Sequence, residues 1–124
     1  MKRTPLLIRK KGILHITKAK HARTSWERFK GLMGVSPSSF NYALVFHLER
    51  EGILEGSIHM LFMKMPIDVM WLDAHRGIIG MKENVPAWSL NHSPPAPAPY
   101  IVELPAGTLA HARPKPREKV EWEK

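Results

Sequence analysis

The sequence predicts an all-β protein, rich in strands with one short helix, arranged as a single-domain sandwich or a partly closed barrel. Two features support this fold class. Short apolar runs separated by turn residues recur at near-regular spacing, which is typical of sheet proteins. Only one segment carries the periodicity of an amphipathic helix. A chain of 124 residues has room for one core, so we expect one domain over residues 1–124.

The chain begins with strand signals. Apolar runs at 6–8 and 13–16 flank Gly12, which predicts two strands or one bent strand. Thr24 and Glu27 then form a capping-box pattern, in which each side chain bonds the other residue's main-chain N–H.

A helix over 25–33 follows from this start. Its apolar stripe predicts that it packs as a lid over a sheet, and the stripe consists of Trp26, Phe29, Leu32 and Met33. Gly34 is placed to end the helix in a left-handed conformation. Gly31, within the helix, should allow another backbone to approach closely.

The middle of the chain predicts a buried strand over 42–48 and a meander of three more strands. Pro66 cannot donate to a ladder, so it divides the first two strands of this meander. These two strands span 57–64 and 67–73. A hairpin in which Gly77 can take a positive φ leads to the third strand, 78–83.

The last third begins with a proline-rich loop. Residues 85–99 include seven positions, 93–99, that are too rich in proline for a helix or an inner strand. Strand character returns over 100–104, and 119–122 alternates enough to form a final strand at an exposed edge.

Composition limits the classes of function. The net charge of +8 is uneven, because residues 1–31 carry ten Lys and Arg but one Glu. No long apolar segment or signal sequence is visible, so we expect a cytoplasmic protein without a membrane partner. Cysteine is absent, which excludes disulfides and thiolate sites. The absence of cysteine and glutamine also points to a heat-adapted source.

The stretch 57–73 holds the first candidates for chemistry. Asp68 lies among apolar residues, and a buried carboxylate can act as a general base. The preferred interpretation is that Asp68 accepts main-chain N–H bonds where the chain bends at Pro66. His59 is the one polar side chain in its run, and strand alternation could bring it to Asp68. Asp73 is most simply the aspartate of a hairpin turn.

The proline-rich loop supplies two more ligand-binding candidates, Trp88 and His92. Trp88 has no obvious core to fill, and a loop tryptophan often anchors a ligand; the equal alternative is that it caps one end of a barrel. The seven histidines show no metal-binding spacing, and nucleotide-binding or serine-hydrolase motifs are absent. We therefore expect no metal and no cofactor.

Three motifs in order resemble the DUF192 family, also called UPF0127. They are Ala22-x-Thr24-x-x-Glu27-Arg28-x-x-Gly31-Leu32-Met33, then Pro66-Ile67-Asp68-Val69-x-x-Leu72-Asp73, then Tyr100-Ile101-Val102-Glu103-Leu104-Pro105-Ala106-Gly107. The resemblance spans about residues 16–122 and implies a compact β-rich domain whose biochemical role is uncharacterised. The chain departs from common family residues at Val35 and at Met60-Leu61-Phe62-Met63, where apolar groups replace the polar part of a possible family site. It also departs near the end, where Arg117-Glu118 replaces a common Gly-Asp.

Three functions remain open at this point. We favour a non-enzymatic binding module that holds a small molecule, a sugar or a peptide segment in a cleft between the 85–99 loop and the 57–68 strand. One alternative is a hydrolase or isomerase that uses Asp68 and His59. The other is nucleic-acid binding through the basic N-terminal third, although interleaved aromatic residues are missing there.

Overall fold

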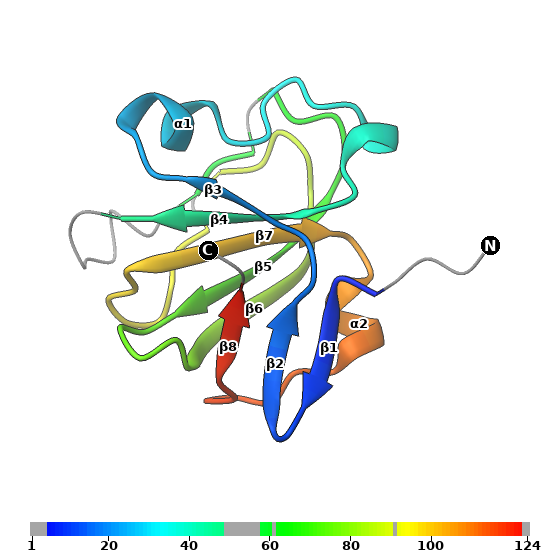
Figure 1. Cartoon of the computed structure of the whole chain (residues 1–124). Helices are drawn as coiled ribbons and strands as arrows, with labels where there is room; N and C mark the ends of the chain where they lie inside the picture. The colour runs from blue at the N-terminus through cyan, green and yellow to red at the C-terminus, as the bar shows by residue number, and fades with distance from the viewer. Residues whose placement is uncertain (1–4, 49–57, 61, 91, 123–124) are drawn as a thin grey trace.

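The structure, a computed structural model, describes residues 5–48, 58–60, 62–90 and 92–122. Within these ranges the strands form two sheets (Figure 1). In chain order the strands and helices are β1 (Leu7–Lys10), β2 (Ile13–Ile16), β3 (Ala19–Ala22), α1 (Ser25–Lys30), the 3-10 helix η1 (Pro37–Ser39), β4 (Ala43–His47), β5 (Ile67–Leu72), β6 (Ile78–Val85), β7 (Tyr100–Pro105), α2 (Thr108–Ala112) and β8 (Val120–Trp122). None of the helices in the described ranges is long and apolar enough to cross a membrane.

The larger sheet has five strands in the order β3-β4-β7-β5-β6. Its centre is covered on both faces, since every residue of β5 is buried. β7 pairs with β4 on one side and β5 on the other, both antiparallel, so that Glu103 lies between Leu44 and Val69. β3 runs parallel to β4 at one edge.

The smaller sheet, β1-β2-β8, joins the two ends of the chain. β1 and β2 form a hairpin whose turn residues Lys11 and Gly12 both have positive φ, of 50° and 77°. β8 comes from the opposite end of the sequence and runs parallel to β2. Side chains of both sheets, including Leu14, Val120 and Val102, fill the core between them.

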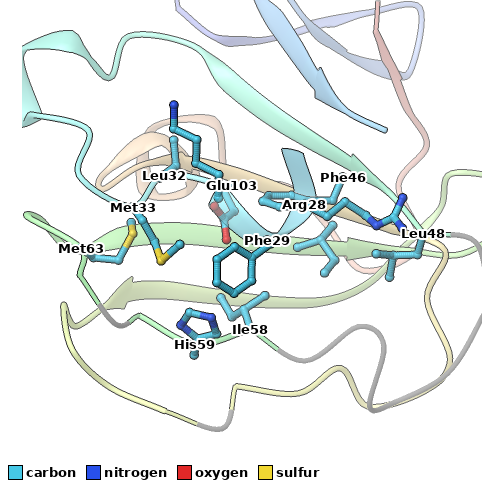
Figure 2. A pocket seen from close by; sticks show the side chains of 13 residues that line it. Arg28, Phe29, Leu32, Met33, Phe46, Leu48, Ile58, His59, Met63 and Glu103 are labelled. Carbon is cyan, nitrogen blue, oxygen red and sulfur yellow. The ribbon is translucent and has the colours of Figure 1, made fainter. Parts of the chain in front are cut away.

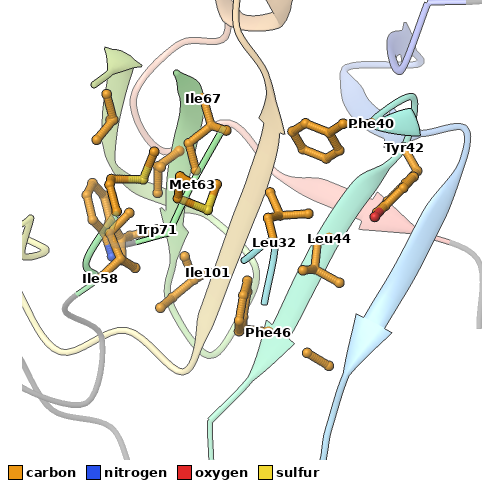
Figure 3. Packing of buried hydrophobic residues seen from close by; sticks show 14 of the residues in the cluster. Leu32, Phe40, Tyr42, Leu44, Phe46, Ile58, Met63, Ile67, Trp71 and Ile101 are labelled. Atoms are coloured by element: carbon orange, nitrogen blue, oxygen red, sulfur yellow. The ribbon is translucent and has the colours of Figure 1, made fainter. Parts of the chain in front are cut away.

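A second apolar core covers the other face of the larger sheet (Figure 3). It contains the large buried side chains of Trp71 and Phe46, with Leu32 from the chain just after α1. The proline-rich loop also closes this face. A Cβ added at Gly80 would lie 2.7 Å from the ring of Pro95, so the loop packs directly on β6.

The structure confirms the predicted all-β class and the strands at 67–73, 78–83 and 100–104, within a residue or two at most ends. The predicted meander is wrong. The described residues of 57–64 form no strand beyond an isolated bridge from Ile58 to His92, and β7 takes the place beside β5. The remaining residues of that prediction, 57 and 61, lie outside the described residues. β3 and α2 were not predicted.

The helix begins where the capping box predicted, at Ser25, but ends at Lys30 rather than 33. Gly31, with φ of 46°, is its C-terminal cap, and Gly34 lies beyond it. The predicted lid is only partly correct. Leu32 is buried, yet Trp26 and Phe29 are 68% and 63% exposed, and no residue within α1 is buried.

Candidate functional site

A pocket of about 250 Å³ lies between α1 and the outer face of the larger sheet (Figure 2). Its wall surface is about half polar and half apolar, and the sheet contributes one carboxyl group to it. The residues that line it are Arg28, Phe29, Lys30, Gly31, Leu32, Met33, Phe46, Leu48, Ile58, His59, Met63, Ile101 and Glu103. At about 30 Å³ per water molecule, this volume corresponds to about eight waters, which suits a small ligand.

Glu103 is the most unusual residue of the pocket. It extends from the middle of β7 on the apolar face of the sheet and is only 5% exposed. No hydrogen bond or ion pair joins it to another described residue, and its carboxyl oxygens reach the open space of the pocket. Because burial disfavours the charged form, it raises the pKa of the Glu103 carboxyl to about 8. In Figure 2 this carboxyl group points toward the ring of Phe29.

The end of α1 shapes the upper wall of the pocket. The capping box fixes the first turn, since Glu27 N donates to Thr24 Oγ1 and Thr24 N donates to Glu27 Oε1, each at 3.0 Å. Gly31 ends the helix against β4, where an added Cβ would lie 3.2 Å from the ring of Phe46. The close approach predicted at Gly31 is therefore to a side chain, not to another backbone. This turn places Phe29 beside the pocket.

The cationic head of Arg28 lies away from Glu103. Its Nη1 donates to the main-chain oxygens of Arg23, at 2.6 Å, and His47, at 3.3 Å. Figure 2 shows the guanidinium at the Leu48 end of the pocket. The basic side chain of Arg28 therefore contributes its hydrocarbon stem to the wall, and its charge is bound to carbonyl groups.

A basic and aromatic cluster lies at this same end of the sheet. His21 Nδ1 is 2.8 Å from His47 Nε2, and Arg23 Nη1 approaches His47 Nδ1 at 3.5 Å. Burial, assisted by the charges of Arg23, His21 and Arg76, lowers the pKa of His47 to about 4. His47 is therefore neutral at pH 7.

The structure supports the preferred interpretation of Asp68. This carboxylate is fully buried and accepts three main-chain N–H bonds, from Asn84 to Oδ1 at 3.0 Å and from Gly107 and Leu109 to Oδ2 at 3.1 and 2.9 Å. Asp68 pairs in register with Leu104, whose side chain lies in the core between the sheets, whereas Glu103 and the pocket lie on the opposite face.

His59 and Asp68 therefore do not form the pair that an enzyme using them requires. Of these two candidates, His59 lines the pocket and Asp68 does not. Asp73 is a hairpin-turn aspartate as predicted, because its Oδ1 accepts from the main-chain N–H of His75 and Gly77 at 2.8 and 2.9 Å. The positive φ of that turn belongs to Arg76 rather than Gly77.

The predicted cleft between residues 57–68 and the 85–99 loop is replaced by direct pairing in the described residues. Ile58 and His92 exchange main-chain hydrogen bonds of 2.8 and 3.2 Å, and Met60 exchanges similar bonds with Ser89 and Trp88. With this side of the segment occupied, the pocket opens on the other side, toward α1.

Trp88 and His92 are not brought into the pocket. Trp88 is 58% exposed and its ring lies 5.1 Å from that of Phe62. His92 bonds Ser89 Oγ through Nε2 at 2.7 Å and lies 3.1 Å from Lys82 Nζ through Nδ1. Of the four predicted ligand-binding residues, only His59 lies where the pocket is.

Sequence reasoning missed Glu103. The available signal was a single acidic residue in the middle of the apolar run Tyr100 to Leu104. Such a residue in a strand buried on both faces must be paired, protonated or directed at a ligand.

Comparison with known proteins decides the family. The model of the DUF192 family, described as an uncharacterized ACR, matches residues 6–122. This chain belongs to the DUF192 family. The DUF192 chain is 38% identical over 118 residues to a UPF0127 protein of Thermococcus sibiricus, covering 95% of this chain and 74% of the relative. It is 39% identical to a UPF0127 protein of Thermococcus kodakarensis, covering 85% of this chain and 64% of that protein.

The fold of the DUF192 chain also matches a solved structure. A crystal structure of a protein of unknown function from Novosphingobium aromaticivorans superposes with a TM-score of 0.81 and 23% sequence identity. The match covers 95% of this chain and 84% of the other. At this identity the likeness concerns the fold alone, so the function must be argued from the pocket.

Proposed function

We propose that this DUF192 chain is a non-enzymatic binding module that holds a small molecule in the pocket between α1 and the larger sheet. The observation that carries the proposal is Glu103, a buried carboxyl group that opens into the pocket without a hydrogen-bond partner in the described chain. Burying such a group costs free energy unless something bonds it. A ligand that bonds Glu103 offsets that cost.

The composition of the pocket fits binding better than catalysis. Small-molecule sites combine apolar and aromatic side chains with a few polar groups that fix orientation, and this pocket has Phe29, Phe46 and Ile101 around Glu103. A hydrolase or isomerase that uses Asp68 with His59 is disfavoured, because Asp68 is enclosed and bonded to main chain on the other face. Nucleic-acid binding stays a prediction from the charge distribution.

A thermal-shift screen with a pocket-filling variant tests the proposal. Met33→Trp places a large ring at the pocket wall, and Met81→Trp makes the same exchange on β6 outside the pocket. A ligand at a hundred times its Kd stabilises the folded state by about 2.7 kcal/mol, which raises the melting temperature measurably. We expect small molecules that stabilise the wild type and Met81→Trp but not Met33→Trp.

Two results would contradict the proposal. One is that no compound of a few hundred small polar and apolar molecules shifts the melting temperature at millimolar concentration. The other is that Met33→Trp, still folded by circular dichroism, keeps every shift seen with the wild type. Turnover of any hit, followed by mass spectrometry, would instead favour an enzyme.

A further inference from the structure

We infer that the ligand of this pocket carries a cationic amine, which forms an ion pair with Glu103. The inference rests on the proposed function and names the chemical class of its ligand. Its basis is a mismatch of charge in the pocket: the carboxyl group of Glu103 is directed inward, and the guanidinium of Arg28 is bonded to main-chain carbonyl groups instead.

Among the residues that the structure describes, no lining side chain forms a hydrogen bond or ion pair with the carboxylate. Arg28 Nη1 is bonded to the carbonyl oxygens of Arg23 and His47, and Lys30 is exposed on α1. Neither forms an ion pair with Glu103 in the described chain. A buried carboxylate without a cation is unfavourable, and an ammonium group brought by a ligand provides the missing charge.

The walls suit the rest of an organic amine. Aromatic rings attract cations over their faces, and Phe29 and Phe46 both line the pocket. Ile58, Met63 and Ile101 offer apolar surface for a hydrocarbon body. An anionic ligand would instead meet the carboxylate with like charge. The volume of about 250 Å³ fits a compact amine such as cyclohexylamine.

The competing occupant is a neutral ligand that accepts a hydrogen bond from protonated Glu103. The pH dependence of affinity distinguishes it from an ammonium ligand. Because burial raises the pKa of Glu103 to about 8, the free pocket at pH 6 holds the neutral acid. An ammonium ligand needs the ionised form, so its binding releases a proton and its affinity rises with pH until about 8. A neutral acceptor needs the protonated form, so its affinity falls above about 8.

Other titratable groups near Glu103 must be separated from its effect. His59 faces the pocket from the 58–60 segment, Arg28 and Lys30 face it from α1, and Tyr42 on the chain leading into β4 interacts with Glu103 electrostatically. Tyr42 has its own pKa raised by burial and by the charge of Glu103. Two variants, His59→Gln and Tyr42→Phe, therefore serve as controls.

The test is isothermal titration of the intact protein with matched probes at pH 6, 7, 8 and 9. The probes are cyclohexylamine, cyclohexanol and cyclohexanecarboxylate, with the benzylamine, benzyl alcohol and benzoate set as a second shape. We expect the amines to bind at least tenfold tighter than the alcohols at pH 8. Between pH 6 and 7 the amine affinity should rise about tenfold, because one proton is released.

Variants complete the test. Glu103→Gln keeps the shape of the side chain and should weaken amine binding at least tenfold at pH 8, with little change for the alcohols. His59→Gln and Tyr42→Phe should keep the pH dependence of the wild type. Amines that bind no better than alcohols, or whose affinity falls as pH rises to 8, would overturn the inference.

The outcomes also separate this inference from the proposed function. If the alcohols bind and Met33→Trp prevents it, but the amines have no advantage, the pocket is a binding site and only the ammonium ligand is wrong. If none of the six probes binds at millimolar concentration, the ammonium inference is wrong, and the wider screen decides the proposed function.

Discussion

At the scale of single residues, Glu103 shows how one buried group contributes to the pH dependence of folding stability. Its carboxyl group is protonated more readily in the folded chain, with a pKa of about 8, than in the unfolded chain, whose ordinary value is 4.5. The folded state therefore binds more protons between these values. The stabilisation is complete below about pH 4.5 and is lost as pH rises toward 8.

The variant Glu103→Gln tests this linkage without any ligand. Glutamine is neutral at all pH values, so the variant should match the wild type in free energy of unfolding near pH 5 and exceed it near pH 9. The wild-type value should fall relative to the variant by up to about 1.4 kcal/mol per pH unit within that window. Urea denaturation at pH 5, 7 and 9 measures the difference.

The matched control is Glu83→Gln, which removes a carboxylate from an exposed position on β6. Its stability curve should run parallel to that of the wild type. If the Glu103→Gln curve also runs parallel, the carboxyl group is already ionised at pH 5, and the effect of burial on its pKa is wrong.

At the scale of elements, the two helices show why one was predicted and the other was not. α1 is started by a local signal, the capping box of Thr24 and Glu27, three residues apart. α2 begins at Thr108, and the N-cap residue before it, Gly107, has no side chain to cap the helix. Its N-terminal N–H groups, those of Gly107 and Leu109, are bonded instead by Asp68 from β5, about forty positions away in sequence.

The same contrast explains the rest of the prediction. Strands and turns with local signals, such as the β5–β6 hairpin at Asp73, were predicted from sequence. Pairing partners were not: β7 inserts between β4 and β5 although a long loop precedes it. The pocket depends on this pairing, because Glu103 faces α1 only when β7 lies between β4 and β5. Of the residues that line the pocket, only His59 was predicted from sequence as a ligand-binding residue.

The variant Asp68→Asn tests the role of Asp68 as a distant cap. An amide group can accept through one oxygen only, so at least one buried N–H of α2 or of Asn84 would lose its partner. Each unsatisfied buried group costs about 1 to 3 kcal/mol, so we expect a loss of about 2 to 5 kcal/mol in unfolding free energy. Faster amide exchange at Leu109 should accompany it.

Two comparisons make this result specific. Asp73→Asn changes a turn aspartate with two similar main-chain bonds in a part-buried hairpin, and it should cost less and leave exchange at Leu109 unchanged. A loss from Asp68→Asn no greater than that from Asp73→Asn would mean that Asp68 does not hold α2 in place.

At the scale of the whole molecule, the C-terminal segment joins the two sheets. Val120 N donates to Arg76 O at 2.9 Å and Ile78 N donates to Glu118 O at 3.1 Å, so β8 is bonded to the hairpin of the larger sheet. The guanidinium of Arg76 also lies 4.0 Å from the ring centre of Trp122. These contacts connect residues that are far apart in sequence, and we therefore expect the two sheets to unfold together.

The variant Val120→Ala tests this coupling. Val120 is fully buried between the sheets, so its truncation should lower the unfolding free energy by about 1 to 3 kcal/mol. Glu121→Ala, one position along β8 and facing the other way, should change it by less than about 0.5 kcal/mol.

Hydrogen exchange then locates the loss of stability in Val120→Ala. If the sheets form one cooperative unit, the slowest amides of β2 and of β7 should both exchange faster in Val120→Ala, by the same factor, because both exchange only through global unfolding. Acceleration confined to β1, β2 and β8 would show instead that the smaller sheet opens alone, and that the larger sheet with its pocket persists without it.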